Sequence, residues 1–157
     1  MKVRTSYPGF VAVADGYLTE VFKRVVNLQF LRGDGPIIAF QVLSIFKIST
    51  HLTGYIIELL SLQVENEYGA FGVGNDPHDI PYLIHLRDKM IELGSTEMFF
   101  TSDTPSKNSD LGAIPGELQT ANFQNNADKE FDALDILQPG KPYMVAEFWS
   151  GWVRLIL

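Results

Sequence analysis

The sequence has no cysteine, only three histidines in 157 residues, and few positive charges. Without cysteine, disulfide frameworks, thiolate zinc sites and cysteine nucleophiles are excluded. Lys and Arg number 12 against 19 Asp and Glu, so the net charge is −7. Nucleic acid and anionic membranes bind clustered positive charge, and neither is expected as a partner. The first ten residues also lack the apolar run of a secretory signal.

Short signatures of other chemistries are missing as well. The three histidines, His51, His78 and His85, do not have the spacing of a metal site, so no metal is expected. No Gly-x-Ser-x-Gly motif is present, and serine hydrolysis therefore has no support. The glycines at 69, 72 and 74 miss the spacing of a dinucleotide-binding loop.

What is present is the composition of a folded domain, with 46% hydrophobic and 20% charged residues. Apolar periodicity predicts helices at 8–31, 79–94 and 126–137, and short apolar runs predict strands at 37–40, 98–101, 120–123 and 143–149. Because the strands alternate with helices, an α/β fold of parallel β/α units is expected. The residues expected to face its core include Val13, Tyr17, Leu18, Phe22, Leu83, Met90, Ile91, Phe131 and Leu134.

Residues 42–63 do not fit this alternation, because they lengthen what should be one strand between Ile37 and Glu67. The segment is apolar but contains Lys47, His51 and Glu58, and a membrane helix needs about 18 residues without charge. No membrane span is therefore expected. If the segment is helical, its apolar side carries Ile45, Ile48, Leu52, Tyr55, Ile56 and Leu59.

Two glutamates, Glu67 and Glu147, each follow or end an apolar strand. Because the carboxyl ends of parallel strands meet at one end of a barrel, these side chains can face each other across its mouth. Glycoside hydrolysis uses such a pair: one carboxylic acid protonates the leaving oxygen and the other carboxylate attacks the anomeric carbon. Retention of configuration needs a separation of about 5–5.5 Å.

Aromatic and amide side chains stand beside both glutamates. Asn66 is a natural partner for a ring hydroxyl, and Trp149 and Trp152 are candidates for a wall on which a sugar stacks. The residues alone leave a second interpretation open, in which Tyr68 and Trp149 only pack in the core and the paired glutamates are ordinary members of an acidic protein.

Two longer motifs decide between these interpretations. Residues 35–41 and 64–69 together read GPIIAFQ-VENEYG, and residues 141–152 read KPYMVAEFWSGW. Both resemble the two signatures of the glycoside hydrolase family 35 β-galactosidases, in the right order and spacing. Residues 4–10 and 99–103 are similar to further segments of that family.

The resemblance implies a (β/α)8 barrel in which Glu67 and Glu147 end the fourth and seventh strands. It implies that Glu67 is the general acid/base, that Glu147 is the nucleophile, and that Asn66 holds the sugar 2-hydroxyl. Trp149 stands where relatives carry an aromatic residue at the sugar site. A β-galactoside or oligosaccharide is then the substrate, with no metal or organic cofactor, and the family suggests a lysosomal, vacuolar or extracellular location.

The chain departs from the family pattern in three ways. A complete barrel takes about 250 residues, so residues 1–152 are expected to form a partial barrel of about strands four to seven. Residues 42–63 are expected to be a non-family insert, and residues 153–157 a non-family tail. We therefore expect a fragment with little or no activity.

Deleting residues 42–63 restores the uninterrupted GPIIAFQVENEYG. The segment begins with valine, whose codons start with GT, and ends with glutamine, which CAG encodes, so it has the boundaries of an unspliced intron. Two other interpretations remain open from the sequence: a non-catalytic truncated product that at most binds galactosides weakly, or a related retaining β-glycosidase.

Overall fold

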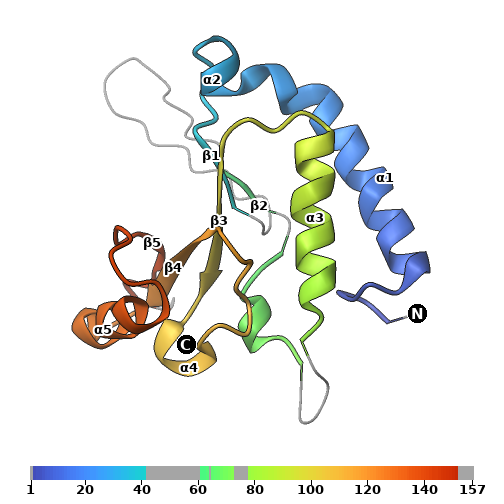
Figure 1. Cartoon of the computed structure of the whole chain (residues 1–157). Helices are drawn as coiled ribbons and strands as arrows, with labels where there is room; N and C mark the ends of the chain where they lie inside the picture. Colours follow the sequence, from blue (N-terminus) through green and yellow to red (C-terminus); the bar gives the residue numbers. More distant parts are fainter. Residues whose placement is uncertain (1, 42–60, 64, 73–77, 152–157) are drawn as a thin grey trace, which may run out of the picture. The chain divides into compact units, whose positions relative to one another are not determined.

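The computed structural model describes residues 2–41, 61–63, 65–72 and 78–151. These residues form two compact units, one from 1–66 with 79–100 and one from 67–78 with 101–157. Strand β3 (Met98–Asp103) begins in the first unit and ends in the second. In each unit the strands pair in parallel and helices lie between them in the chain, which confirms an α/β fold that matches part of a (β/α)8 barrel (Figure 1).

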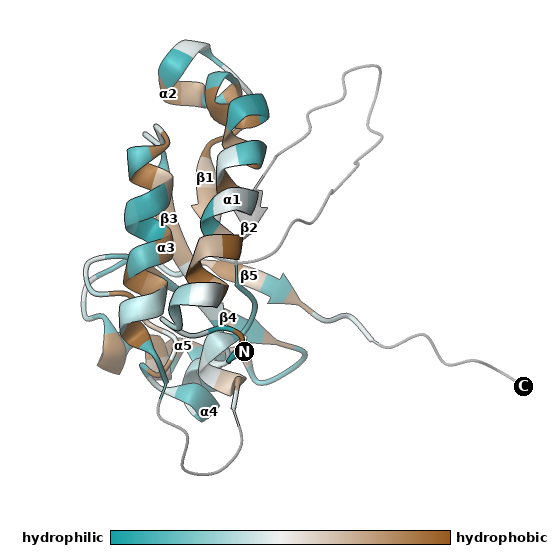
Figure 2. Ribbon diagram, turned by 90° about the vertical axis from the view of Figure 1, so that its right-hand side faces the viewer, coloured by the Kyte–Doolittle hydropathy of each residue, from teal (hydrophilic) through white to brown (hydrophobic). Residues whose placement is uncertain are grey.

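The first unit contains helices α1 (Pro8–Val25), η1 (Val26–Leu28), α2 (Phe30–Gly33) and α3 (Ile80–Glu92). Its strands are β1 (Ala39–Gln41), β2 (Ser61–Gln63) and the first half of β3. Strand β1 pairs in parallel with β2 on one side and with β3 on the other. Helices α1 and α3 lie side by side, and each alternates between apolar and polar surface along its length (Figures 1 and 2).

An aromatic core joins α1 to the strands of this unit. The ring of Phe22 stacks on Phe40 of β1 with centroids 5.5 Å apart, and Phe40 contacts Phe99 of β3 at 5.9 Å. Leu18, Leu83 and Met90 are buried as expected. By contrast Val13, Tyr17 and Ile91 are exposed. The apolar stripe predicted for each helix was therefore wider than the face that the sheet covers.

The helix predicted over 8–31 is not continuous to its end, because α1 ends at Val25 and the short helices η1 and α2 follow it, separated by Gln29. Gln29 is fully buried and extended, and its backbone bridges to Ile37 in place of continuing the helix. Its side-chain amide donates to the carbonyls of Val26 and Gly94, and its side-chain oxygen accepts from the backbone of Thr96. These tertiary hydrogen bonds stabilise the break, which the local periodicity does not encode.

The second unit contains η2 (Tyr68–Ala70), the end of β3, α4 (Pro105–Asn108), β4 (Leu118–Phe123), α5 (Ala127–Leu137) and β5 (Val145–Phe148). Strands β4 and β5 pair in parallel, with a register shift between Ala121 and Asn122. Helix α5 packs Leu134 against Ala121 and Phe123, and Phe131 adjoins this cluster. The last strand is shorter than the predicted 143–149.

The segment 42–63 is described only at its end, where 61–63 form β2. The helix considered for its apolar side lies outside the described residues, as do Trp152 and the tail at 153–157. Within the part of the chain that is described, no helix is long and apolar enough to cross a membrane.

Candidate active site

Glu67 lies at a sharp turn of the backbone in the second unit. Its φ of 46° and ψ of 52° place it in the left-handed region, which is unfavourable for a residue with a Cβ. It immediately precedes η2, and its carbonyl accepts a hydrogen bond from the backbone of Ala70 at 2.9 Å. Such strain is common where surrounding structure fixes a functional side chain.

The Glu67 side chain is held by a buried amide of β4. Asn122 is 0% exposed, and its Nδ2 donates to Oε1 of Glu67 at 3.1 Å. The hydroxyl of Ser102, at the end of β3, donates to Oδ1 of Asn122 at 2.9 Å. Because the amide oxygen is occupied by Ser102, the amide nitrogen is the group that faces Glu67.

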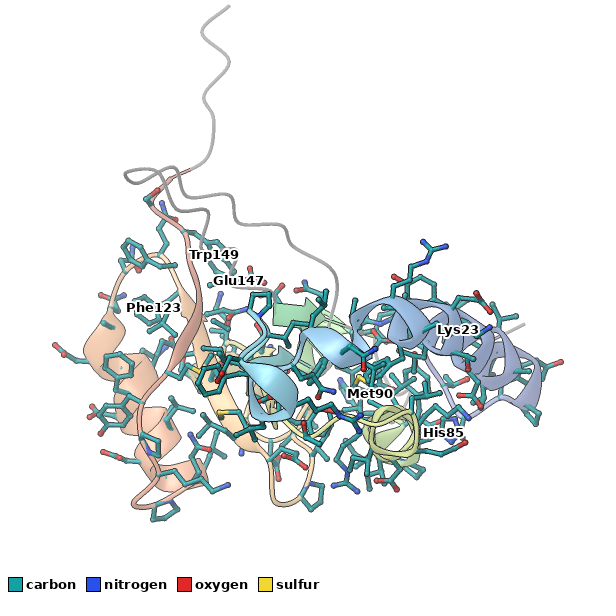
Figure 3. The ribbon with its side chains drawn as sticks, turned by 90° about the horizontal axis from the view of Figure 1, so that it is seen from above. Lys23, His85, Met90, Phe123, Glu147 and Trp149 are labelled. Atoms are coloured by element: carbon teal, nitrogen blue, oxygen red, sulfur yellow. The ribbon has the colours of Figure 1, made fainter. Side chains whose placement is uncertain are left out.

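Glu147 belongs to β5, and its partner on the neighbouring strand β4 is the same asparagine, Asn122. Residues paired in register in a parallel sheet project to the same face. Trp149 donates from its indole Nε1 to Oε2 of Glu147 at 2.9 Å, and the two side chains lie together in Figure 3. The backbone of Trp149 donates to the carbonyl of Phe123, so the end of β5 is fixed on β4.

The structure thus brings three of the four predicted site residues into one unit. Glu67 and Glu147 both adjoin Asn122, and Trp149 binds Glu147. Asn66 belongs to the other unit, where its carbonyl accepts from a guanidinium NH2 of Arg4 at 2.7 Å. Its own side chain is exposed.

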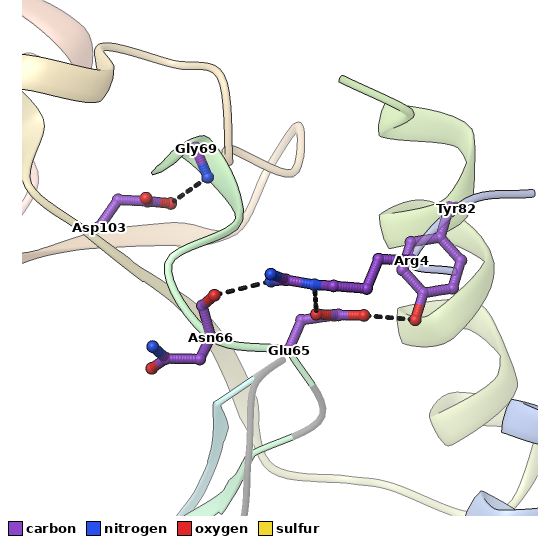
Figure 4. A network of polar contacts seen from close by, with 6 residues as sticks. All are labelled: Arg4, Glu65, Asn66, Gly69, Tyr82 and Asp103. Carbon is purple, nitrogen blue, oxygen red and sulfur yellow. Dashed lines mark hydrogen bonds and ion pairs between the residues drawn. The ribbon is translucent and has the colours of Figure 1, made fainter. Parts of the chain in front are cut away.

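The residue before Asn66 is a buried carboxylate of the first unit (Figure 4). Glu65 is only 7% exposed, accepts from Arg4 Nε at 2.5 Å and accepts from the hydroxyl of Tyr82 at 2.5 Å. Burial raises the pKa of Glu65, and the hydrogen bonds from Tyr82 and Arg4 oppose that rise. The segment that leads to Asn66 is therefore bound to both the start of the chain and α3.

A second buried carboxylate lies in the unit of the glutamate pair. Asp103, at the end of β3, accepts from the backbone N–H of Gly69 and from the side-chain amide of Asn108. Burial raises the pKa of Asp103; backbone and Asn108 hydrogen bonds oppose the rise, and the charge of Glu67 adds to it. Asp103 is thus close enough to Glu67 to feel its charge.

Ser102, Asp103 and Asn122 are the residues that the sequence reasoning missed. Each stands at or near the carboxyl end of a predicted strand, at 98–101 or 120–123, and each follows apolar residues. That position is where parallel α/β folds place polar functional groups, so the signal was available. Among the described residues there is no cluster of three His, Asp or Glu that could hold a metal ion.

What this arrangement can do chemically follows from its groups. The buried amide of Asn122 binds the carboxylate of Glu67, which is on a strained turn, and the ladder partner of Asn122 is Glu147, whose carboxylate accepts from an indole. A pair of this kind can combine proton transfer at one carboxyl group with nucleophilic attack by the other.

Comparison with known proteins gives matches along nearly the whole chain. The sequence profile of glycosyl hydrolases family 35 matches residues 44–155. The chain is 34% identical over 154 residues to human beta-galactosidase-1-like protein 2 and 32% identical over 154 residues to a beta-galactosidase of Xanthomonas manihotis, each covering 97% of this chain. It is 29% identical over 150 residues to mouse beta-galactosidase-1-like protein 3. The matches cover 20%, 21% and 19% of these proteins, so the chain spans about a fifth of their length.

Proposed function

The chain belongs to glycosyl hydrolases family 35, and from this we propose that it carries the catalytic pair of a retaining β-galactosidase. Glu67 is the general acid/base and Glu147 is the nucleophile. The substrate class is a terminal β-galactoside, supported by the names of the relatives in the human and bacterial matches.

The reaction is a double displacement. The carboxylate of Glu147 attacks the anomeric carbon while the carboxylic acid of Glu67 gives its proton to the departing glycosidic oxygen. A covalent galactosyl ester on Glu147 results. Glu67, now a carboxylate, takes a proton from water, and that water displaces Glu147 from the same face that the leaving group occupied. Two inversions give net retention.

One observation carries this assignment: Asn122 donates to Glu67 and is the ladder partner of Glu147. A single buried residue of β4 therefore adjoins both glutamates, one through its side chain and the other through the strand ladder. Trp149 supports the role of Glu147, because the indole hydrogen bond holds one carboxylate oxygen and orients the other.

Asn66 completes the proposed sugar site. We assign to its amide the hydrogen bond with the galactose 2-hydroxyl, which strengthens as positive charge develops on the ring. The ring face of Trp149 would cover the apolar C–H surface of the sugar, as aromatic side chains do in carbohydrate sites. Both assignments come from the positions of these residues in the two family signatures.

The 157 residues by themselves are proposed to have little or no activity, because a full barrel takes about 250 residues. We also propose that residues 42–63 are an insert. In support, β1 and β2 pair residue for residue at an offset that matches the length of this segment: Ala39 with Ser61, Phe40 with Leu62, and Gln41 with Gln63. The strand just before the segment, β1, and the strand at its end, β2, are thus two equivalent strands, and either could lead into the VENEYG motif.

The test is β-galactosidase activity of three purified proteins: the 157-residue chain, the chain without residues 42–63, and that shortened chain completed to a full barrel with strands from a relative. We expect turnover only in the completed barrel. In it, Glu147→Gln should lower kcat by about a thousandfold or more, as loss of a nucleophile does. Turnover by the 157-residue chain would contradict the account of what the barrel needs.

Azide separates the two carboxylate roles in the completed barrel. With Glu147→Ala, azide occupies the place of the nucleophile and should give an α-galactosyl azide. With Glu67→Ala, azide attacks the galactosyl ester and should give a β-galactosyl azide. Proton NMR of the anomeric hydrogen distinguishes these products, and the reverse pattern would exchange the two assignments.

A further inference from the structure

The conformation of Glu67 needs an explanation that its own side chain does not supply. A glutamate with φ 46° and ψ 52° is in a region that glycine, asparagine and aspartate occupy far more readily. The hydrogen bond to Asn122 holds the carboxylate but does not restrain the backbone. The turn must therefore be stabilised by contacts of the residues that follow.

Those contacts come from Asp103. Its Oδ2 accepts from the backbone N–H of Gly69 at 3.2 Å. Its Oδ1 accepts from Nδ2 of Asn108 at 2.8 Å. Gly69 lies two residues after Glu67, in η2, so this buried carboxylate binds the turn directly behind the glutamate (Figure 4).

The main chain approaches the Asp103 carboxylate closely at two glycines. A Cβ at Gly112 would lie 2.0 Å from Oδ2 of Asp103 and 2.7 Å from the backbone nitrogen of Gly69. A Cβ at Gly69 would lie 2.8 Å from Oδ1 of Asp103. Two glycines thus let the main chain close around Asp103, and this leaves its oxygens facing the donors of the turn.

Asp103 and its neighbour Ser102 act on the same glutamate by two routes. Ser102 orients Asn122, which binds the Glu67 carboxylate, and Asp103 binds the backbone behind it. We propose that Asp103 is a positioning residue for Glu67: it holds the left-handed turn that directs the Glu67 carboxylate onto Asn122. The functional meaning of this rests on the acid/base role proposed for Glu67, whereas the conformational claim is tested without any activity.

The experiment is NMR of the full 157-residue chain, with the 13Cα and 13Cβ shifts of Glu67 as the measure of its φ and ψ. In the parent chain Glu67 should show left-handed shifts. In Asp103→Ala these should move to the extended range, and the amide of Gly69 should exchange about tenfold faster or more, as expected for loss of a hydrogen bond to a charged acceptor.

Two variants control for the charge and for folding. Asp103→Asn should largely rescue the Glu67 shifts, because its Oδ1 still accepts from Gly69 while Asn108 can rotate its amide to accept from the new NH2. Asp110→Asn makes the same charge change at an exposed position of the following turn and should leave the Glu67 shifts unchanged. Amides of β4 and β5 report whether each variant retains its fold.

A pH titration of the parent chain gives a readout that general destabilisation would not produce. The amide shift of Gly69 should follow the carboxyl 13C shift of Asp103, with a midpoint above the ordinary pKa of an aspartate, because burial raises the pKa of Asp103. Glu67 and His78 also carry ionisable groups near this turn, and Nε2 of His78 lies 3.1 Å from the carbonyl of Gly69. The carboxyl signals of Glu67 and Asp103 and the ring signals of His78 are therefore followed separately.

Three results would overturn the proposal. They are left-handed Glu67 shifts retained in a folded Asp103→Ala chain, extended or random-coil shifts at Glu67 in the parent, and a Gly69 amide that follows His78 in place of Asp103. An inactive completed barrel would overturn the proposed function and leave these results intact.

Discussion

At the scale of single residues, burial and hydrogen-bond donors shift the pKa values of carboxyl groups in opposite directions. Glu65 is buried between Arg4 and Tyr82, and desolvation raises its pKa above the ordinary 4.5. Glu20 is fully exposed, and its hydrogen bond with Lys23 lowers its pKa. The two groups should therefore contribute to stability with opposite dependence on pH.

For Glu65 the raised pKa means that the folded state binds a proton more tightly than the unfolded chain. Its contribution is fully present below the ordinary pKa of 4.5 and is lost as the pH rises through the raised value. We expect the free energy of unfolding of the parent minus that of Glu65→Gln to be largest near pH 4 and to decrease toward pH 7. Urea unfolding at several pH values, about 4 to 7, measures this difference.

Glu20→Gln is the matched control for that series. The lowered pKa of Glu20 gives a contribution to stability that is present above its ordinary pKa and is lost as the pH falls. Any difference in the free energy of unfolding between the parent and Glu20→Gln should therefore grow as the pH rises. A difference for Glu65→Gln that stays constant or grows with pH would contradict the burial argument.

At the scale of elements, the second unit depends on one helix packed on one strand. Leu134 of α5 is 1% exposed and contacts Ala121 and Phe123 of β4, the strand that also carries Asn122. On the same helix Ile136 is 81% exposed. The packing of α5 therefore supports the strand that adjoins both glutamates, through one face of the helix only.

Leu134→Ala should destabilise the fold by about 2–5 kcal/mol, because it removes buried methyl groups and leaves a cavity against β4. Ile136→Ala removes similar atoms from an exposed position and should change the free energy of unfolding by less than about 0.5 kcal/mol. Urea unfolding of both variants measures this. Equal effects of the two substitutions would mean that α5 is not packed on β4 as described.

At the scale of the whole molecule, the sheet has an edge strand, β5, that exposes apolar side chains. Within the described residues β5 is an edge strand, and its Phe148 is 62% exposed with Val145 and the nearby Tyr143 also exposed. Exposed apolar edge strands are templates for pairing with another chain. Such a surface fits a piece of a larger barrel whose neighbouring strands would cover it.

We expect the 157-residue chain to self-associate as its concentration rises, which sedimentation velocity measures. Phe148→Glu should reduce this association, because a charge on the edge strand opposes pairing with a second chain. Ile136→Glu places the same charge at an exposed apolar residue of α5 and should have less effect. A parent chain that remains monomeric across the concentration range would contradict this prediction.

Much of the fold was predictable from the sequence because its signals are local. The β/α alternation, the helix at 79–94 with Asp79 as its N-cap, and the burial of Leu18, Leu83 and Leu134 follow from periodicity and turn residues. The break after Val25 was not predictable, since it depends on hydrogen bonds from Gln29 to residues more than 60 positions away.

The same division holds for the candidate site. The sequence by itself determined the family and predicted the pair Glu67 and Glu147, because those residues lie within contiguous motifs that can be read without a fold. Only the tertiary structure decided that Asn122 adjoins both glutamates and that Asp103 binds the turn behind Glu67. These contacts join residues 25 to 55 positions apart, and strand pairing and burial, which no local pattern specifies, create them.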